Sequence, residues 1–183
     1  MLFTVLTANC QNGQTKTDNL KISDFIFKSI FGTNTKDLNS IYCLLGRGFF
    51  TTPSAENSDS LINNWIKSHP NAVVIPVSSI EPIESTKPKS KLIYCWVIEK
   101  NDTLNNFLVK HGCFPGGTMI RPKTWKEMEK WEKELYKEDS EKPDVKVYIP
   151  DKAYKTFLDQ IKSAEIYAVK NKFGIWNQQK NEE

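Results

Sequence analysis

The spacing of hydrophobic residues along the chain predicts several helices. Four apolar residues at helical spacing indicate a helix over residues 59–69, which ends before Pro70 because the residue preceding a proline disfavours helical geometry. A shorter helix follows Thr103, a residue type suited to capping a helix start, and ends at Gly112. A long amphipathic helix opens at Asp151 and closes near the end of the chain.

Other apolar runs predict strands. Residues 92–98 are continuously apolar, as expected of a strand that is buried on both faces. Residues 72–80 are rich in β-branched side chains, and residues 40–50 read as a buried strand that glycines interrupt. Residues 145–149 suit a short strand. Residues 19–38 are ambiguous, because four apolar residues fit a helical face while the phenylalanines do not settle the period.

This order of elements predicts an α+β fold with a small sheet and packed helices. We expect one domain over residues 19–176, with a helical insertion at about 115–150 and a disordered tail over 177–183. Within the insertion, residues 124–137 suit a charged helix whose stripe combines two tryptophans, a methionine and a leucine. Such a stripe packs into a core in most proteins, and it also suits a helix that binds a partner.

The first 18 residues allow two interpretations. An apolar run precedes Cys10 and a polar stretch follows it, as in an export signal that ends at a lipid-modified cysteine. The run lacks a preceding Lys or Arg, and Asn9 is an unusual neighbour for such a cysteine. The alternative is a frayed or strand-forming terminus. The first interpretation places the protein in the cell envelope or outside the cell by a lipid anchor, and the second leaves it cytoplasmic.

Composition and charge are those of an ordinary globular protein. The 183 residues are 39% hydrophobic and 26% charged, with a net charge of +3. Only Arg47 and Arg121 are arginines, so the positive charge is carried by lysine, as on a solvated surface. No apolar run is long enough to span a bilayer. Cys43 and Cys95 lie within apolar runs and are expected to be buried, and the cysteine spacings fit no zinc or redox motif.

Residues 91–114 combine a strand, a turn and a helix that contains the pattern N-x-x-L-V-x-x-G, from Asn105 to Gly112. Near the end of the chain, an Ala-Glu pair at residues 164–165 is followed by Gly-Ile-Trp at residues 174–176. In their order and spacing these segments resemble the staphylococcal-nuclease-like family over roughly residues 40–176. The resemblance implies a five-stranded OB-type β-barrel with helices packed on it.

The resemblance also implies a mechanism that this chain matches poorly. In the family, Ca²⁺, carboxylates and two arginines support phosphodiester hydrolysis, with one arginine opening the motif R-L-x-G-I-D-x-P-E. Here Cys43 occupies that arginine's position, Gly48 that of the metal-binding aspartate, and Ser54 that of the glutamate. Ser90 stands where the second arginine is expected, although a shift of one residue would put a lysine there.

A different set of residues could serve an active enzyme. Arg47 in its glycine-flanked break, Glu81, Glu84 and Lys91 are the catalytic candidates. Lys87 and Lys89 would then add a phosphate-binding rim. The simpler interpretation makes Arg47 a turn residue and the lysine-containing loop a solvated connector.

Two functions therefore follow from the sequence. The first is a binding or interaction module without the family's metal-dependent phosphodiesterase mechanism, and its partner would be a nucleic acid or a protein. The second is an active nuclease that hydrolyses DNA or RNA with non-standard residues, and it would need Ca²⁺ only if the family's mechanism survives. A weaker third hypothesis is single-strand binding by base stacking on Tyr94 and Trp96, which requires both to be exposed.

Overall fold

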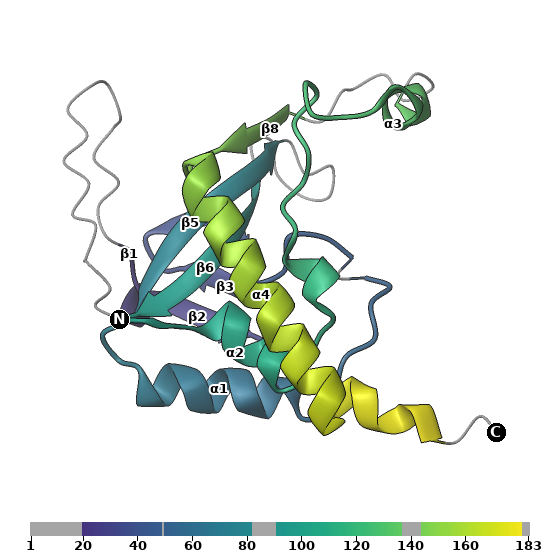
Figure 1. Cartoon of the computed structure of the whole chain (residues 1–183). Helices are drawn as coiled ribbons and strands as arrows, with labels where there is room; N and C mark the ends of the chain where they lie inside the picture. The colour runs from purple at the N-terminus through teal and green to yellow at the C-terminus, as the bar shows by residue number, and fades with distance from the viewer. Residues whose placement is uncertain (1–19, 49, 82–90, 137–143, 181–183) are drawn as a thin grey trace.

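The computed structural model describes residues 20–48, 50–81, 91–136 and 144–180. Within them the fold is mixed α+β, with a curled sheet that forms a half-barrel and helices packed on it (Figure 1). The α-helices are α1 (Ser58–Ser68), α2 (Leu104–Lys110), α3 (Lys130–Leu135) and α4 (Asp151–Asn171). The long helix α4 crosses the sheet, α1 lies at one end of it, and α3 stands apart from the rest (Figure 1).

The strands of the curled sheet are mostly antiparallel neighbours. They are β1 (Leu20–Lys21), β2 (Phe25–Lys28), β3 (Phe31–Asn34), β4 (Asp37–Cys43), β5 (Val73–Glu81), β6 (Lys91–Glu99), β7 (Asp102–Thr103) and β8 (Asp144–Val147). Their order is β1-β5-β6-β4-β3-β2, with β7 beside β6 and β8 beside β5. Among the strands in the described ranges, only β4 and β6 pair in parallel. The strands β1 and β2 lie at opposite ends of this order, although a single 3₁₀ turn, η1 (Ile22–Asp24), separates them in the chain.

Residues 20–38 of the ambiguous segment are mostly extended, interrupted by the 3₁₀ turn η1, and Ile22, Phe25 and Ile30 are buried. Phe25 is buried and packs edge-on against Tyr42 at 4.8 Å between ring centroids, while its neighbour Ile26 faces outward. Ser29 adopts φ +56° at the turn between β2 and β3. Buried and exposed side chains therefore alternate in this segment as in a strand, and β2 pairs antiparallel with β3, which pairs antiparallel with β4.

Three predicted helices and three predicted strands are confirmed. Helix α1 ends at His69, just before Pro70, and Thr103 caps α2 by accepting a hydrogen bond from the backbone of Asn106 at 3.2 Å. The buried stripe of α4 includes Phe157, whose ring stacks on Trp96 at 4.2 Å between centroids. The strands β5, β6 and β8 occupy the predicted positions.

The predicted helix over residues 124–137 is wrong for its first half. Helical geometry begins only at Lys130, and residues 125–128 form a turn in which the Glu127 carboxylate accepts from the Thr124 backbone N–H at 2.8 Å and from Arg121 at 2.6 Å. A capping box between Glu129 and Glu132 then starts α3. The side chains of Trp131 and Leu135 are 65% and 68% exposed, so this part of the expected stripe does not pack into the core.

The two segments that carry the family resemblance contact each other. Gly112 follows α2 with φ +66°, and Gly174 follows α4 with φ +51°. Their backbones pack so closely that a Cβ on Gly112 would lie 2.1 Å from the Phe173 carbonyl oxygen. The Ile175 N–H also donates to the Gly112 carbonyl at 3.0 Å. Glycine is needed at both positions, since each combines a left-handed conformation with a backbone contact.

Asn105 ties α2 to the sheet. Its side chain is fully buried, and its Oδ1 accepts from the Val97 N–H at 3.2 Å. Its Nδ2 donates to the carbonyls of Leu44 at 2.8 Å and Cys95 at 3.1 Å. The pairing of β4 with β6 stops opposite Tyr94, so Asn105 supplies hydrogen bonds to β6 where its neighbour strand leaves.

Among the described residues, no helix is both long and apolar enough to cross a membrane. The predicted lipidation residue, Cys10, lies outside the described residues. A 3₁₀ helix, η3 (Gly174–Lys180), follows α4 and reaches into the segment that the sequence analysis expects to be a tail.

Candidate functional site

The structure describes three of the predicted catalytic residues and does not bring them together. Glu81 ends β5 and forms an ion pair with Lys146 of β8 at 3.2 Å. Lys91 begins β6 and lies at the same end of the sheet, since the last residues of β5 pair with the first residues of β6. Arg47 lies beyond the far end of β4, where its Nε donates to a backbone carbonyl of η2 (Gly116–Met119) at 3.2 Å. No hydrogen bond or ion pair among the described residues joins these three.

Glu84, Lys87 and Lys89 lie outside the described residues. They follow Glu81 in the chain, in the segment between β5 and β6. Their predicted roles in catalysis and phosphate binding stay predictions. Arg47 is exposed, as the sequence analysis requires of a residue in a glycine-flanked break.

The positions that answer the family's catalytic motif hold no charged groups. Cys43 is fully buried, and burial raises the pKa of its thiol to about 12. The Cys95 thiol donates to the Cys43 carbonyl at 3.5 Å between sulfur and oxygen, and both residues belong to the hydrophobic core. Gly48 adopts φ +72° in a turn. Within the described ranges, no cluster of three or more His, Cys, Asp or Glu side chains could hold a metal ion. These positions do not fit the Ca²⁺ that the family implies.

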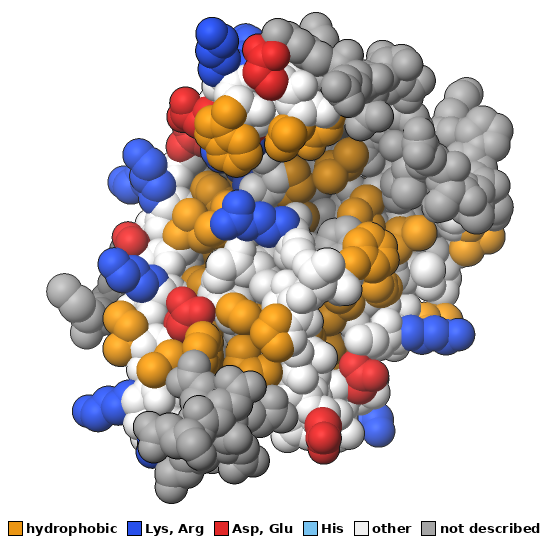
Figure 2. Space-filling model, turned by 90° about the vertical axis from the view of Figure 1, so that its right-hand side faces the viewer, with side chains coloured by type: hydrophobic (Ala, Val, Ile, Leu, Met, Phe, Trp, Pro, Cys, Tyr) orange, Lys and Arg blue, Asp and Glu red, His pale blue; other side chains and the backbone are white. Residues whose placement is uncertain are grey.

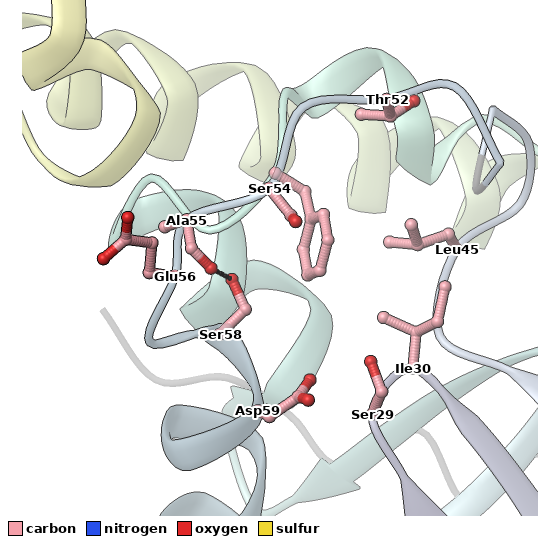
Figure 3. Close-up of a pocket in the computed structure, with 10 residues that line it drawn as sticks. Ser29, Ile30, Leu45, Thr52, Ser54, Ala55, Glu56, Ser58 and Asp59 are labelled. Carbon is pink, nitrogen blue, oxygen red and sulfur yellow. Dashed lines mark hydrogen bonds between the residues drawn. The ribbon is translucent and has the colours of Figure 1, made fainter.

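A pocket lies directly beside this motif segment, at the start of α1 (Figure 3). We call it the α1 pocket. It encloses about 250 Å³, and its wall is made by the turn after β2, the chain that follows β4, the first turn of α1 and one residue after α2. Its lining residues are Ser29, Ile30, Leu45, Thr52, Ser54, Ala55, Glu56, Ser58, Asp59 and Phe114.

The side chains of the α1 pocket differ in direction. Asp59 and Ser29 point into the same space from opposite walls, whereas the carboxylate of Glu56 points away (Figure 3). Ser58 is buried, and its hydroxyl donates to the Ala55 carbonyl at 2.7 Å. Sequence reasoning missed this site because its walls come from four separate segments, and because a single aspartate near a helix start is ordinary.

The described surface gives little support to base stacking or to a basic groove. Tyr94 and Trp96 are buried, and the Tyr94 hydroxyl donates to the Met119 carbonyl at 2.8 Å. The third hypothesis requires both rings to be exposed, and this condition is not met. On the face drawn in Figure 2, the lysine and arginine side chains are scattered among hydrophobic groups and form no continuous stripe.

The second arginine has a structural role that the sequence analysis did not find. Arg121 is 7% exposed and makes two hydrogen bonds to the Glu127 carboxylate, at 2.9 and 2.6 Å. Its guanidinium also lies 5.1 Å from the ring centroid of Tyr154, on α4. The hydrogen bonds from Arg121 lower the pKa of Glu127 to about 2. These contacts hold the segment that follows η2 against α4. In the sequence, this pairing is indicated only by an arginine and a glutamate six residues apart.

Comparison with known proteins gives no assignment: no family model matches the chain, and no curated protein or solved structure matches it significantly.

Proposed function

We propose that the chain is a staphylococcal-nuclease-like domain of OB type that binds a ligand and does not hydrolyse phosphodiesters. The strand order supports the OB-type part of this proposal. If β1, η1 and β2 are counted as one bent strand, the sheet has five main strands in the order 1-2-3-5-4-1. The third and fifth of these, β4 and β6, are parallel. A first strand that pairs at both ends of the sheet is what an OB-type barrel requires, so this order supports the proposal.

The contact between Gly112 and Gly174 supports the likeness to the family. The sequence resemblance depends on two short patterns that lie far apart in the chain. Their glycines touch through backbone atoms, and each needs a left-handed conformation. If the two patterns matched the family only by chance, contact between them in the fold would not be expected.

The observation that carries the functional part is the complete burial of Cys43. A guanidinium at this position would have to enter the core beside Cys95, where no counter-charge is available among the described residues. Removal of one charged or hydrogen-bonding donor to the transition state typically lowers a rate by about 10² to 10³. The loss of the arginine together with the metal-binding aspartate leaves the family's mechanism without its main electrostatic groups.

A cleavage assay tests this proposal. The purified protein should not degrade single-stranded DNA, double-stranded DNA or RNA when Ca²⁺ is present, because no cluster of His, Cys, Asp or Glu within the described ranges could hold the ion and the motif's arginine position is a buried cysteine. Arg47→Ala, purified in the same way, is the matched control. Ca²⁺-dependent cleavage by the wild type that disappears in Arg47→Ala would overturn the proposal and establish the active nuclease, while excluding a contaminating enzyme.

A further inference from the structure

We propose that the α1 pocket binds a small organic cation, namely an ammonium group on a short apolar stem. This inference rests on the proposed function, because it treats the pocket beside the motif segment as a binding site and not as a site of cleavage. It goes further by naming the ligand chemistry.

The polar lining of the pocket favours a donor of hydrogen bonds. Every polar side-chain atom in its wall is an oxygen, from the hydroxyls of Ser29, Thr52, Ser54 and Ser58 and from two carboxylates. The buried Ser58 hydroxyl is already engaged by the Ala55 carbonyl and the Cys113 thiol, so the acceptors for a ligand are the hydroxyls of the other three residues and the Asp59 carboxylate. An ammonium group has donors only, so it matches this lining.

The charge of the pocket points the same way. Asp59 faces the cavity (Figure 3), and no Lys, Arg or His contributes to the wall. The first turn of α1 carries a partial positive charge, but Asp59 lies within that turn and offsets it. An anionic ligand would meet a carboxylate and no cation, which disfavours it.

The size and the apolar lining of the pocket favour an organic cation over a bare metal ion. Its volume of about 250 Å³ corresponds to about eight water molecules at roughly 30 Å³ each. Ile30, Leu45 and Phe114 add apolar wall, which stabilises a hydrocarbon stem but not a hydrated ion. Phe114 also supplies an aromatic ring, and aromatic rings attract cations that lie over their faces. A stem of about four carbons with a terminal ammonium combines these properties.

This chemistry has two sources, a free amine and the lysine side chain of another protein. Both present the same ammonium on an apolar stem. They differ in whether a peptide backbone follows the stem, and two probes distinguish them. n-Butylammonium represents the free amine, and Nα-acetyl-lysine amide represents the side chain with its backbone.

The test is a titration of the full chain followed by amide NMR shifts. n-Butylammonium should bind with a dissociation constant in the millimolar range, as expected of about five heavy atoms, and should shift residues of the α1 pocket. Uncharged n-butanol and anionic n-butyrate, which share the stem, should bind several-fold more weakly. Tighter binding of Nα-acetyl-lysine amide than of n-butylammonium would identify a lysine side chain as the ligand, and equal or weaker binding a free amine; both results support the proposed chemistry.

Two variants locate the interaction. Asp59→Asn should weaken n-butylammonium binding about five-fold, since an exposed ion pair contributes up to about 1 kcal/mol. Glu56→Gln should keep the affinity within about two-fold, because that carboxylate points away from the cavity (Figure 3). If Asp59→Asn does not fold, the comparison of the three butyl probes on the wild type still decides.

Equal or tighter binding of n-butyrate or n-butanol would overturn the inference, and so would unchanged affinity in a folded Asp59→Asn. These failures would leave the cleavage result untouched. Ca²⁺-dependent cleavage would overturn the proposed function whatever the titration shows, so the two proposals fail separately.

Discussion

Replacing Asn105 with alanine should destabilise the protein more than any other single polar substitution in α2. The amide side chain satisfies one buried N–H and two buried carbonyls, those of Val97, Leu44 and Cys95. Alanine can pair with none of them, and the fully buried position limits access of water. A buried polar group left without a partner costs about 1–3 kcal/mol. We therefore expect Asn105→Ala to lower the free energy of unfolding by about 3–5 kcal/mol, since two of these groups are carbonyls that can keep other partners.

Denaturant unfolding monitored by tryptophan fluorescence measures this loss. The neighbouring Asn106 provides the control, because its Oδ1 is buried and has no hydrogen-bond partner among the described residues. Asn106→Ala should change the free energy of unfolding by less than about 1 kcal/mol, since it removes an unsatisfied acceptor and introduces a better helix former. A loss below about 1 kcal/mol in Asn105→Ala, or equal losses in the two variants, would refute the role assigned to Asn105.

Three further predictions concern packing, pH and thiol chemistry. Gly112→Ala should cost at least about 2–3 kcal/mol in a thermal or denaturant unfolding experiment, because its Cβ would collide with the Phe173 carbonyl; Gly117→Ala, whose Cβ meets no atom within 4 Å, should be nearly neutral. The pKa of Glu127 is about 2 in the folded protein and 4.5 ordinarily, so its pairing with Arg121 stabilises the fold fully above pH 4.5 and loses that effect as the pH falls toward 2. The carboxylate is 42% exposed, so solvent screening reduces the loss of unfolding free energy to about 1 kcal/mol. The wild type should lose this amount when unfolding is measured at pH 3 instead of pH 7, and Glu127→Gln should not. The three buried cysteines should react with a thiol reagent at pH 8 only after unfolding, since burial raises their pKa values; rapid labelling of any of them in the native protein would show that the core is open there.

The elements with strong local patterns could be predicted from the sequence. Helix α1 has a clear apolar face and a proline just after it, and Thr103 and Gly112 delimit α2 through its capping bond and left-handed turn. The strand β6 is continuously apolar, and its residues 93–97 are buried on both faces of a sheet in which it lies between β5 and β4. In each case, local chemistry and tertiary burial favour the same structure.

The rest depends on contacts between distant residues. The period of residues 19–38 is unclear because η1 interrupts an otherwise extended segment, so only pairing with β5 and β3 defines the strands. Residues 124–129 have a helical pattern, and Glu127 accepts from the Thr124 N–H as at a helix start. The same carboxylate also binds Arg121, and these residues form a turn instead, with the helix beginning only at Lys130. Tertiary contacts override local preference in both places.

The α1 pocket was also beyond sequence reasoning. Three of its sides come from segments that surround β4 and α1, and the fourth comes from Phe114 after α2. None of its residues belongs to a motif with a distinctive spacing. The catalytic candidates in the sequence are charged residues in loops, whereas the polar side chains that face the cavity are hydroxyls and one carboxylate.

The seam between Gly112 and Gly174 has a consequence for how the chain matures during synthesis. Strands β1 to β7 and helix α2 leave the ribosome well before α4, yet the end of α2 lacks its backbone neighbour until Gly174 has emerged. The nascent protein therefore remains incomplete, with the apolar groups that α4 will cover still in water, until α4 itself has been synthesised. A chain interrupted by a stop codon before α4 would be held in that state and would become a target for chaperones and proteases.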